Sequence, residues 1–145
     1  MIWGPPGIGR VDLPAPSHEA PWTFASGLGY PAQMSKIHIG IVGTGFIAED
    51  HAKSLNLIRE VAGLSVFDTN GARAEAYAKK YNATVAPTLG KLIAQSDLVW
   101  ICSPPFAHKA AVLQACNAGK AIFCEKPLAH SAADAKVIRN AVRKA

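Results

Sequence analysis

A short glycine-rich turn between a strand-like and a helix-like segment constrains the fold of this chain most strongly. Residues 36–42 have the apolar pattern of a buried strand, and residues 43–48 continue as Gly-Thr-Gly-Phe-Ile-Ala. Gly43 permits a tight turn, Gly45 lets a ligand approach the backbone, and Ala48 lets the following helix pack closely on the strand. The unpaired amides at the start of that helix attract anions. These features are typical of the turn that holds the pyrophosphate of a dinucleotide.

An acidic residue follows the next apolar run. Residues 64–67 are predicted to form the second strand, and Asp68 lies 20 residues after Ala48. A carboxylate at this point accepts hydrogen bonds from the adenosine ribose and repels a 2′-phosphate, which favours NAD as the cofactor. Arg73 is near enough in sequence to leave NADP possible. The alternative interpretation is that Asp68 caps the helix that begins near Gly71.

The composition excludes several other classes of protein. Half of the 145 residues are hydrophobic and 17% are charged, which is ordinary for a globular protein. The net charge of +5 is dispersed, so we predict no nucleic-acid partner, and the apolar runs are too short to span a membrane. The three cysteines form no Cys-x-x-Cys motif and the five histidines are scattered, so we predict no metal site and a cytoplasmic location.

The composition changes near residue 34. The first 33 residues contain six of the ten prolines and five of the twelve glycines, without helix or strand periodicity. We therefore predict that residues 1–34 form a disordered extension and that residues 35–145 form one domain. Residues 4–11 resemble an ATP-binding phosphate loop, but Arg10 and Val11 replace its Lys and its Ser or Thr, so ATP binding is not predicted there.

From residue 36 onward, short apolar runs alternate with helical patterns, which predicts an α/β fold with a doubly wound parallel sheet, a Rossmann domain. The predicted strands cover residues 36–42, 64–67, 84–86, 98–101 and 121–124. The predicted helices follow the glycine turn and then cover about residues 72–81, 89–94, 107–118 and 132–145. The helix over residues 107–118 is predicted to be lined by Ala107, Ala111, Ala115 and Ala118 and to end at Gly119. The first helix is predicted to bury Ile47, Ala48, Ala52, Leu55 and Ile58. The last is predicted to be capped by Ser131 and to bury Ile138, Ala141, Val142 and Ala145, and no stop signal ends it, so we expect a truncated sequence.

Two further segments carry chemical groups at the carboxyl ends of predicted strands, where ligands bind to open parallel sheets. Ser103 and Pro104 follow the fourth strand, where a nicotinamide ribose would pass, although an ordinary strand-to-helix turn explains them equally well. His108 either contacts the cofactor, orients this loop or is simply packed. Glu125 and Lys126 follow the fifth strand. A lysine there can polarise a substrate oxygen or give it a proton, and the alternative is a solvated ion pair.

Together these motifs resemble the N-terminal half of the Gfo/Idh/MocA oxidoreductases, the glucose-fructose oxidoreductase and inositol dehydrogenase family. The resemblance rests on residues 39–48, on Asp68, on Ser-Pro-Pro at 103–105 with His108, and on residues 118–128. It implies NAD(P)-dependent hydride transfer between nicotinamide and a sugar, cyclitol or related polyol. It also implies that Lys126 is the catalytic lysine and that Glu125 helps to bind the nicotinamide half.

Members of that family continue into a second α+β domain, which shapes the substrate pocket, often forms the oligomer interface and usually supplies a further catalytic histidine. The 145 residues contain no counterpart of it. We therefore expect a chain that is inactive alone, with homo-oligomers possible through the missing domain. The alternatives are a non-catalytic NAD(P)-binding sensor or interaction module and an S-adenosylmethionine methyltransferase, against which Glu-Lys-Pro at residues 125–127 argues.

The sequence thus predicts one catalytic residue, Lys126, and one set of cofactor contacts. The predicted contacts are Gly43, Thr44, Gly45, Phe46, Ile47, Asp68, Thr69, Arg73, Ser103, Pro104, His108, Glu125 and Lys126.

Overall fold

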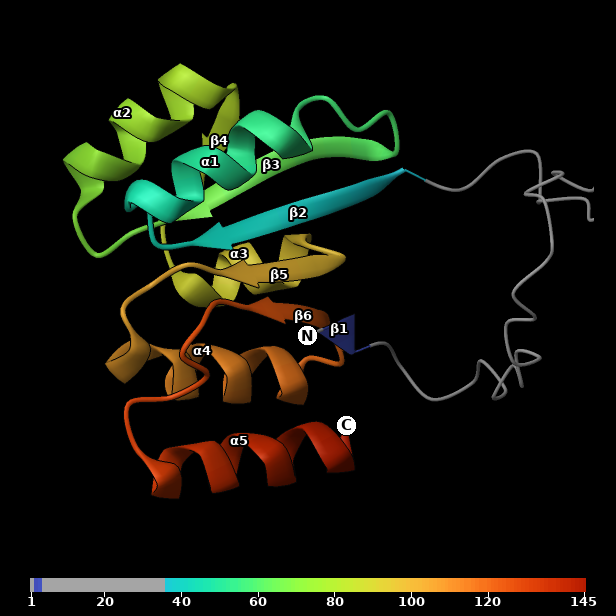
Figure 1. Cartoon of the computed structure of the whole chain (residues 1–145). Helices are drawn as coiled ribbons and strands as arrows, with labels where there is room; N and C mark the ends of the chain where they lie inside the picture. Colours follow the sequence, from blue (N-terminus) through green and yellow to red (C-terminus); the bar gives the residue numbers. More distant parts are fainter. Residues whose placement is uncertain (1, 4–35) are drawn as a thin grey trace, which may run out of the picture.

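The computed structural model describes residues 2–3 and 36–145. Strands and helices alternate along the chain (Figure 1). The strands are β1 (Ile2–Trp3), β2 (Ile37–Val42), β3 (Val61–Phe67), β4 (Ala83–Val85), β5 (Leu98–Ile101) and β6 (Ala121–Cys124). The helices are α1 (Phe46–Leu55), α2 (Gly71–Tyr81), α3 (Leu89–Gln95), α4 (Pro105–Asn117) and α5 (Ala132–Lys144). The predicted strands and helices are therefore confirmed, with small shifts at their ends.

The strands form one sheet in the order β1-β6-β5-β2-β3-β4. The strands β2 to β6 are all parallel, as predicted, and β1 pairs antiparallel with β6 at the edge. Strand β1 lies in residues 1–34, and the expected disorder of that segment stays a prediction, because the structure describes only residues 2–3 of it. The phosphate-loop-like residues 4–11 and the rest of the predicted extension lie outside the described residues.

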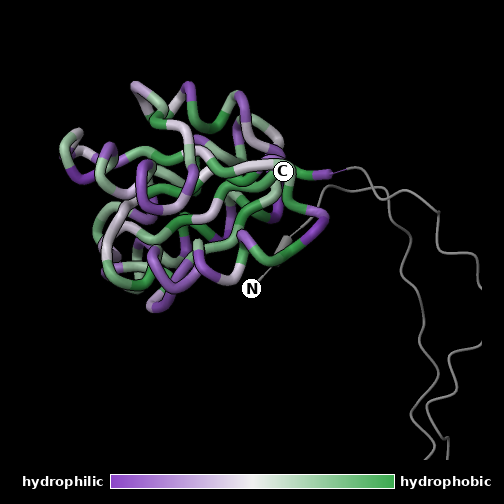
Figure 2. The backbone as a smooth tube through the Cα atoms, turned by 90° about the horizontal axis from the view of Figure 1, so that it is seen from above, coloured by the Kyte–Doolittle hydropathy of each residue, from purple (hydrophilic) through white to green (hydrophobic). Residues whose placement is uncertain are grey.

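Helices cover both faces of the sheet, which confirms the doubly wound arrangement. On one face, α1 and α2 pack over a core that includes Ile41 and Val66. On the other face, α3, α4 and α5 pack over a core that includes Val99 and Ile122. Because side chains alternate along a strand, β2, β3 and β5 contribute to both cores. Figure 2 shows the hydrophobic segments concentrated in the strands and the hydrophilic segments mainly toward the periphery.

Local signals define where the helices begin and end. The side chain of Asn70 caps α2 by accepting a hydrogen bond from the amide of Arg73. The predicted cap of the last helix is confirmed, because the Ser131 hydroxyl accepts from the Asp134 amide, 3.1 Å away. Gly119 follows α4 with a φ of +63°, a left-handed conformation that favours glycine, as predicted for the end of this helix.

Three predicted helix contacts are wrong. Ile58 does not belong to the buried face of α1, because the helix ends at Leu55 and Ile58 lies exposed beyond it. Ala118 is exposed as the C-cap of α4, and Ala145 is exposed after α5. The buried face of α4 instead includes His108, which is 0% exposed. Periodicity located these helices correctly but extended their apolar faces by one position too many.

The register of the parallel strands aligns their carboxyl ends. Val42 at the end of β2 lies opposite Phe67 of β3 on one side and opposite Ile101 of β5 on the other. Ile101 in turn lies opposite Cys124 of β6. In Figure 1 the arrowheads of these four strands point to the same side of the molecule. From β2 the chain adds β3 and β4 on one side of the sheet and then β5 and β6 on the other side. The loops after β2 and β5 therefore run to opposite faces of the sheet, and a crevice is expected between them at this edge.

Candidate cofactor site at the strand ends

The turn after β2 needs glycine at its first position for two reasons. Gly43 has a φ of +90°, a backbone conformation that other residues rarely adopt. A Cβ at this position would also lie 2.8 Å from the backbone nitrogen and Cα of Ser103. The Gly43 amide donates a hydrogen bond to the Phe67 carbonyl, 2.8 Å away. Gly43 therefore joins the loops after β2, β3 and β5.

Gly45 is different, because neither the backbone nor the packing of the described residues requires a glycine there. Its φ of −76° suits any residue, and no atom lies within 4 Å of a Cβ built on it. Gly45 is the N-cap of α1 and has no side chain to accept a hydrogen bond from the first-turn amides. The open space and the uncapped amides fit an anionic ligand that approaches the start of the helix.

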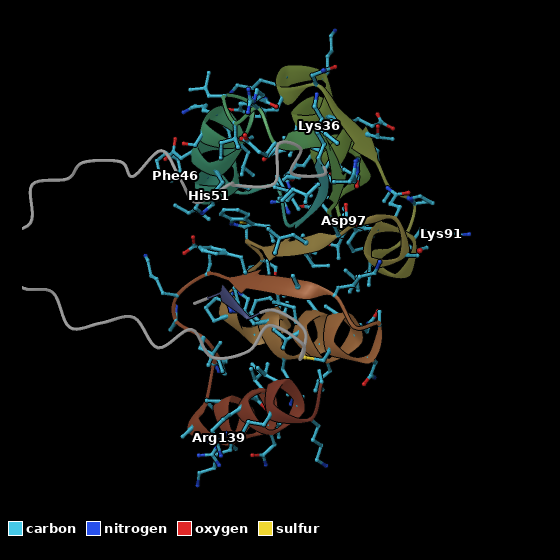
Figure 3. The ribbon with its side chains drawn as sticks, turned by 90° about the vertical axis from the view of Figure 1, so that its right-hand side faces the viewer. Lys36, Phe46, His51, Lys91, Asp97 and Arg139 are labelled. Atoms are coloured by element: carbon cyan, nitrogen blue, oxygen red, sulfur yellow. The ribbon has the colours of Figure 1, made fainter. Side chains whose placement is uncertain are left out.

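The neighbouring residues of the turn differ in how far their side chains are exposed. Thr44 is nearly buried, and Ile47 packs with its side chain against the core. Phe46 begins α1 and is 83% exposed. Figure 3 shows Phe46 together with His51, which lies one helical turn further along α1. Of the predicted contacts in this turn, only Phe46 offers a side chain to solvent.

Asp68 lies at the end of β3 and is held by the chain from several sides. One carboxylate oxygen, Oδ2, accepts hydrogen bonds from the amide and the hydroxyl of Thr44, at 2.9 and 2.7 Å. The other, Oδ1, accepts from the Asn70 amide and from Nη2 of Arg73, both at 2.8 Å. Asp68 is not the cap of α2, because Asn70 has that position. The alternative interpretation of Asp68 is therefore wrong.

The charge of Asp68 is stabilised by these contacts. Its side chain is 4% exposed, and burial by itself raises the pKa of a carboxyl group. The hydrogen bonds from Arg73, Asn70 and Thr44 outweigh the burial and lower the pKa of Asp68 to about 2. The carboxylate is therefore ionised at neutral pH and places a negative charge beside the glycine turn.

A pocket of about 350 Å³ lies against these loops. It is lined by Val42, Gly43, Phe67, Asp68, Thr69, Arg73, Leu89, Ser103, Pro104, Phe106, Ala107, Ala110 and Ala111. Six of these residues are predicted cofactor contacts. The buried hydroxyl of Ser103 has no hydrogen-bond partner among the described residues, so this pocket contains an unsatisfied polar atom. Such a pocket fits a partly polar ligand.

His108 is buried and contacts two of the loops near the pocket through hydrogen bonds. Its Nε2 lies 2.6 Å from the Ser103 carbonyl, and its Nδ1 lies 3.3 Å from the Leu128 carbonyl. Because the ring is fully buried in α4, it connects the loop after β5 with the loop after β6. Of the three functions considered for His108, these contacts favour the orientation of the Ser103 loop.

Glu125 and Lys126 directly follow β6. The Glu125 amide donates to the Ile101 carbonyl and continues the sheet ladder, and its Oε2 accepts from the Lys126 amide at 3.1 Å. Its Oε1 lies 2.6 Å from Nε2 of His51. Burial raises the pKa of Glu125, but the hydrogen bond from His51 helps to lower it below its usual value. Lys126 is exposed, but Glu125 is 14% exposed and is paired with His51, so the alternative of a simple solvated Glu-Lys pair does not describe Glu125.

His51 is not among the site residues predicted from the sequence. It lies in α1 between Ala48 and Ala52, which are both buried against the sheet. One signal in the sequence could have pointed to His51: it is a polar residue next to the buried face of the helix that follows the glycine turn. The partner could not be inferred, because Glu125 lies 74 residues further along the chain.

Two other classes of feature are missing from the described residues. Residues 2–3 and 36–145 contain no group of three or more His, Cys, Asp or Glu side chains that could hold a metal ion. Within the same part of the chain, every helix is too short or too polar to cross a bilayer.

A doubly wound parallel sheet with a Gly-x-Gly-x-x-Ala turn at its reversal point defines a nucleotide-binding Rossmann domain. The chain belongs to the Gfo/Idh/MocA family, described as oxidoreductases with an NAD-binding Rossmann fold, whose model matches residues 37–145. The resemblance inferred from the motifs is confirmed, and NAD(P) is the cofactor class of the family.

The chain is similar to known sugar and inositol dehydrogenases. It is 35% identical over 102 residues to a glucose-6-phosphate 3-dehydrogenase of Bacillus subtilis and 43% identical over 105 residues to an inositol 2-dehydrogenase of Cereibacter sphaeroides. Each match covers 70% of this chain, but only 29% and 31% of the respective relative. The chain thus spans about a third of their length or less.

The fold is also similar to that of solved dehydrogenases. The WlbA dehydrogenase of Bordetella pertussis, in complex with NADH and UDP-GlcNAcA, superposes with a TM-score of 0.71 and 26% identity. The match covers 79% of this chain and 35% of that structure.

Proposed function

We propose that the chain is the cofactor-binding part of a dehydrogenase that transfers hydride between NAD(H) and a carbinol carbon of a sugar, cyclitol or related polyol. The observation that carries this proposal is the register of the strands. It brings the glycine turn, Asp68, the Ser103 loop and the Glu125-Lys126 turn to one edge of the sheet. The sugar and inositol dehydrogenases among the relatives support the substrate class.

The residues of this edge would hold the cofactor in two parts. The start of α1 binds the pyrophosphate through backbone amides, and the space at Gly45 lets it come close. Asp68 and Thr69 bind the adenosine ribose, while Ser103 and Pro104 contact the nicotinamide side. The bound nicotinamide supplies the group that accepts or gives the hydride.

Lys126 acts on the substrate and also lies beside the nicotinamide half of the cofactor. Its amine takes the proton from the substrate hydroxyl during oxidation and returns it during reduction. Glu125 contacts the nicotinamide half. The exposed position of Lys126 at the end of β6 supports this division, because the amine can reach a molecule outside the sheet edge.

NAD is preferred over NADP. The buried, ionised carboxylate of Asp68 repels a 2′-phosphate and accepts hydrogen bonds from ribose hydroxyls. Arg73 is 60% exposed and bound to this carboxylate, so its charge is partly neutralised in place. Release of Arg73 toward a phosphate would leave Asp68 with one fewer partner.

Calorimetric titration of the full chain with NADH and NADPH tests this proposal. We expect saturable NADH binding, and Asp68→Ala should weaken it by about tenfold through the loss of hydrogen bonds to a charged group. Asp50→Ala, which removes an exposed carboxylate from the outer side of α1, is the matched control and should bind like the wild type. A folded chain that binds neither nucleotide would contradict the proposal.

A second candidate function is that of an NAD(P)-binding module without catalysis of its own. The observation that favours it is that the pocket at the strand ends is lined by six predicted cofactor contacts but not by Lys126, the predicted catalytic residue. We expect no NADH formation when the chain is mixed with NAD and myo-inositol or other polyols, measured by absorbance. Turnover of any of these polyols would contradict this second function.

A further inference from the structure

His51 and Glu125 connect the helix that follows the glycine turn with the strand end that presents Lys126. His51 lies in the middle of α1, and Glu125 follows β6. Their side chains are 22% and 14% exposed, and Nε2 of the imidazole donates to Oε1 of the carboxylate over 2.6 Å. The contact therefore spans the reversal point of the sheet, from the β2-α1 unit to the far side of β5.

Two aromatic side chains support the imidazole ring. The ring centroid of His51 lies 4.9 Å from that of Trp100 in β5 and 5.8 Å from that of Phe123 in β6. Trp100 and Phe123 are themselves in contact, with centroids 4.1 Å apart. Figure 3 shows His51 on the side of α1 that faces these strands. Aromatic packing and the hydrogen bond together restrict the ring to one orientation.

Glu125 in turn is restricted at both oxygens. Its Oε1 accepts from His51, and its Oε2 accepts from the backbone amide of Lys126. The backbone of Glu125 is held separately, by the hydrogen bond from its amide to the Ile101 carbonyl, 3.0 Å away. The main chain is thus fixed by the sheet, whereas the direction of the carboxylate depends on His51 and on the Lys126 amide.

We propose that His51 is a positioning residue, which aims the Glu125 carboxylate at the nicotinamide half of the cofactor. This inference rests on the proposed function. Within the described residues, the hydrogen bond of His51 goes to Glu125 and its ring contacts go to Trp100 and Phe123, so we expect its effect at the nicotinamide end. The helix that binds the pyrophosphate thereby also sets the geometry at the other end of the dinucleotide.

The test compares NADH with ADP-ribose, which keeps the adenosine and pyrophosphate parts but lacks the nicotinamide. In the full chain, His51→Phe keeps an aromatic ring against Trp100 and Phe123 and removes the hydrogen-bond donor. We expect this variant to bind NADH about tenfold more weakly, because a hydrogen bond to a charged group is lost. ADP-ribose affinity should stay within about twofold of the wild type.

Further variants separate positioning from damage to the fold. His51→Gln keeps a donor and should restore part of the NADH affinity. Glu125→Gln should weaken NADH selectively, and adding His51→Phe to it should cause no further loss, because both act through one contact. The control is His130→Phe, which makes the same change at an exposed residue before α5.

A second readout follows the carboxyl group itself, by carboxyl ¹³C NMR. His51→Phe should raise the pKa of Glu125, because the imidazole hydrogen bond helps to lower it. The nearby thiols of Cys102 and Cys124 do not interfere, since burial raises their pKa values to about 12 and about 11. If the pKa of Glu125 were the same in His51→Phe as in the wild type, this would contradict a hydrogen bond between His51 and Glu125.

The possible failures can be told apart. If the wild type binds NADH and His51→Phe weakens NADH and ADP-ribose equally, or weakens neither, the positioning function is overturned and the proposed function stands. If the folded wild type binds neither ligand, the proposed function fails and the inference fails with it.

Discussion

At the scale of single residues, glycine is present at the two positions of the turn after β2 for different physical reasons. Gly43 has a left-handed backbone and no space for a Cβ, whereas Gly45 has an ordinary backbone and open surroundings. The first is therefore required by the fold of the chain. The second is explained by a ligand that comes close to the start of α1. The two requirements can be measured separately.

We predict that Gly43→Ala lowers the stability of the fold, whereas Gly45→Val prevents cofactor binding without changing the stability. Gly43→Ala should lower the free energy of unfolding by about 1–3 kcal/mol, because the added Cβ is strained and overlaps the Ser103 backbone. Gly45→Val should leave the urea unfolding midpoint nearly unchanged and abolish NADH binding in calorimetry. A Gly45→Val chain that binds NADH normally would show that no ligand approaches there.

A second prediction at this scale concerns pH and Asp68. Its pKa is about 2 in the folded chain and 3.8 in an ordinary setting, so the folded state binds its proton less readily than the unfolded state. The resulting stabilisation, about 2 kcal/mol, is fully present above pH 3.8 and is lost as the pH falls through about 2. Asp68→Asn should lack this contribution.

Urea unfolding at pH 7 and at pH 2 measures the effect of Asp68→Asn. The difference in unfolding free energy between wild type and variant should shrink toward the lower pH, while the contributions of other carboxylates cancel in the difference. An equal difference at both pH values would refute the attribution to ionised Asp68.

At the scale of secondary-structure elements, one close approach positions α3 against the centre of the sheet. A Cβ on Gly40 of β2 would lie 2.2 Å from Oγ of Ser96 and 2.6 Å from Cδ2 of Leu92. Ser96 is held in turn by its hydrogen bond to the Leu92 carbonyl. The helix therefore lies closer to β2 than any other residue at position 40 would allow.

We predict that Gly40→Ala lowers the free energy of unfolding by about 1–3 kcal/mol through overpacking. The measurement is the urea midpoint, with Gly90→Ala as the matched control. Gly90 lies inside α3 with free space around its Cβ position, so alanine there should raise stability by about 0.5–1 kcal/mol. A neutral Gly40→Ala would mean that α3 shifts at no cost.

The elements also show which features a sequence reveals. Strands β5 and β6 were predicted to the residue, because Leu98–Ile101 and Ala121–Cys124 are short apolar runs between polar or turn residues. The predicted inclusion of Ile58 in α1 failed, because apolar spacing continues past the actual helix end at Leu55. Strand β1 could not be predicted, because only its pairing with β6 makes it a strand.

The same limit applies to the candidate site. The order of motifs along the chain predicted that Gly43, Asp68, Ser103 and Lys126 meet at one sheet edge, since parallel strands end there together. The contact of His51 with Glu125 depends on how α1 crosses β5 and β6, which no local pattern encodes. Whether these residues bind the cofactor remains a prediction.

At the scale of the whole molecule, the site lies across two halves of the sheet. The glycine turn and Asp68 belong to the β2-β3-β4 half, and Ser103 and Glu125 belong to the β5-β6 half. A ligand that contacts all four loops stabilises both halves against unfolding together.

We predict that NADH at ten times its dissociation constant raises the free energy of unfolding by about 1.4 kcal/mol. Hydrogen exchange of amides in β3 and in β6 should slow about tenfold, the factor that corresponds to this free energy. Both strands should respond, because unfolding of either half releases the ligand. Protection confined to one half would show that the ligand contacts only that half.

The central position of β2 also bears on how the chain emerges from the ribosome. The residues of β2, β3 and β4 are synthesised before those of β5 and can pair with one another, but β2 has only one neighbour until Leu98–Ile101 appears. A nascent chain that ends near residue 97 therefore exposes the hydrogen-bonding edge of its innermost strand, which invites pairing with foreign strands. The arrival of β5 closes this vulnerable edge and, in the same step, creates the crevice beside the glycine turn.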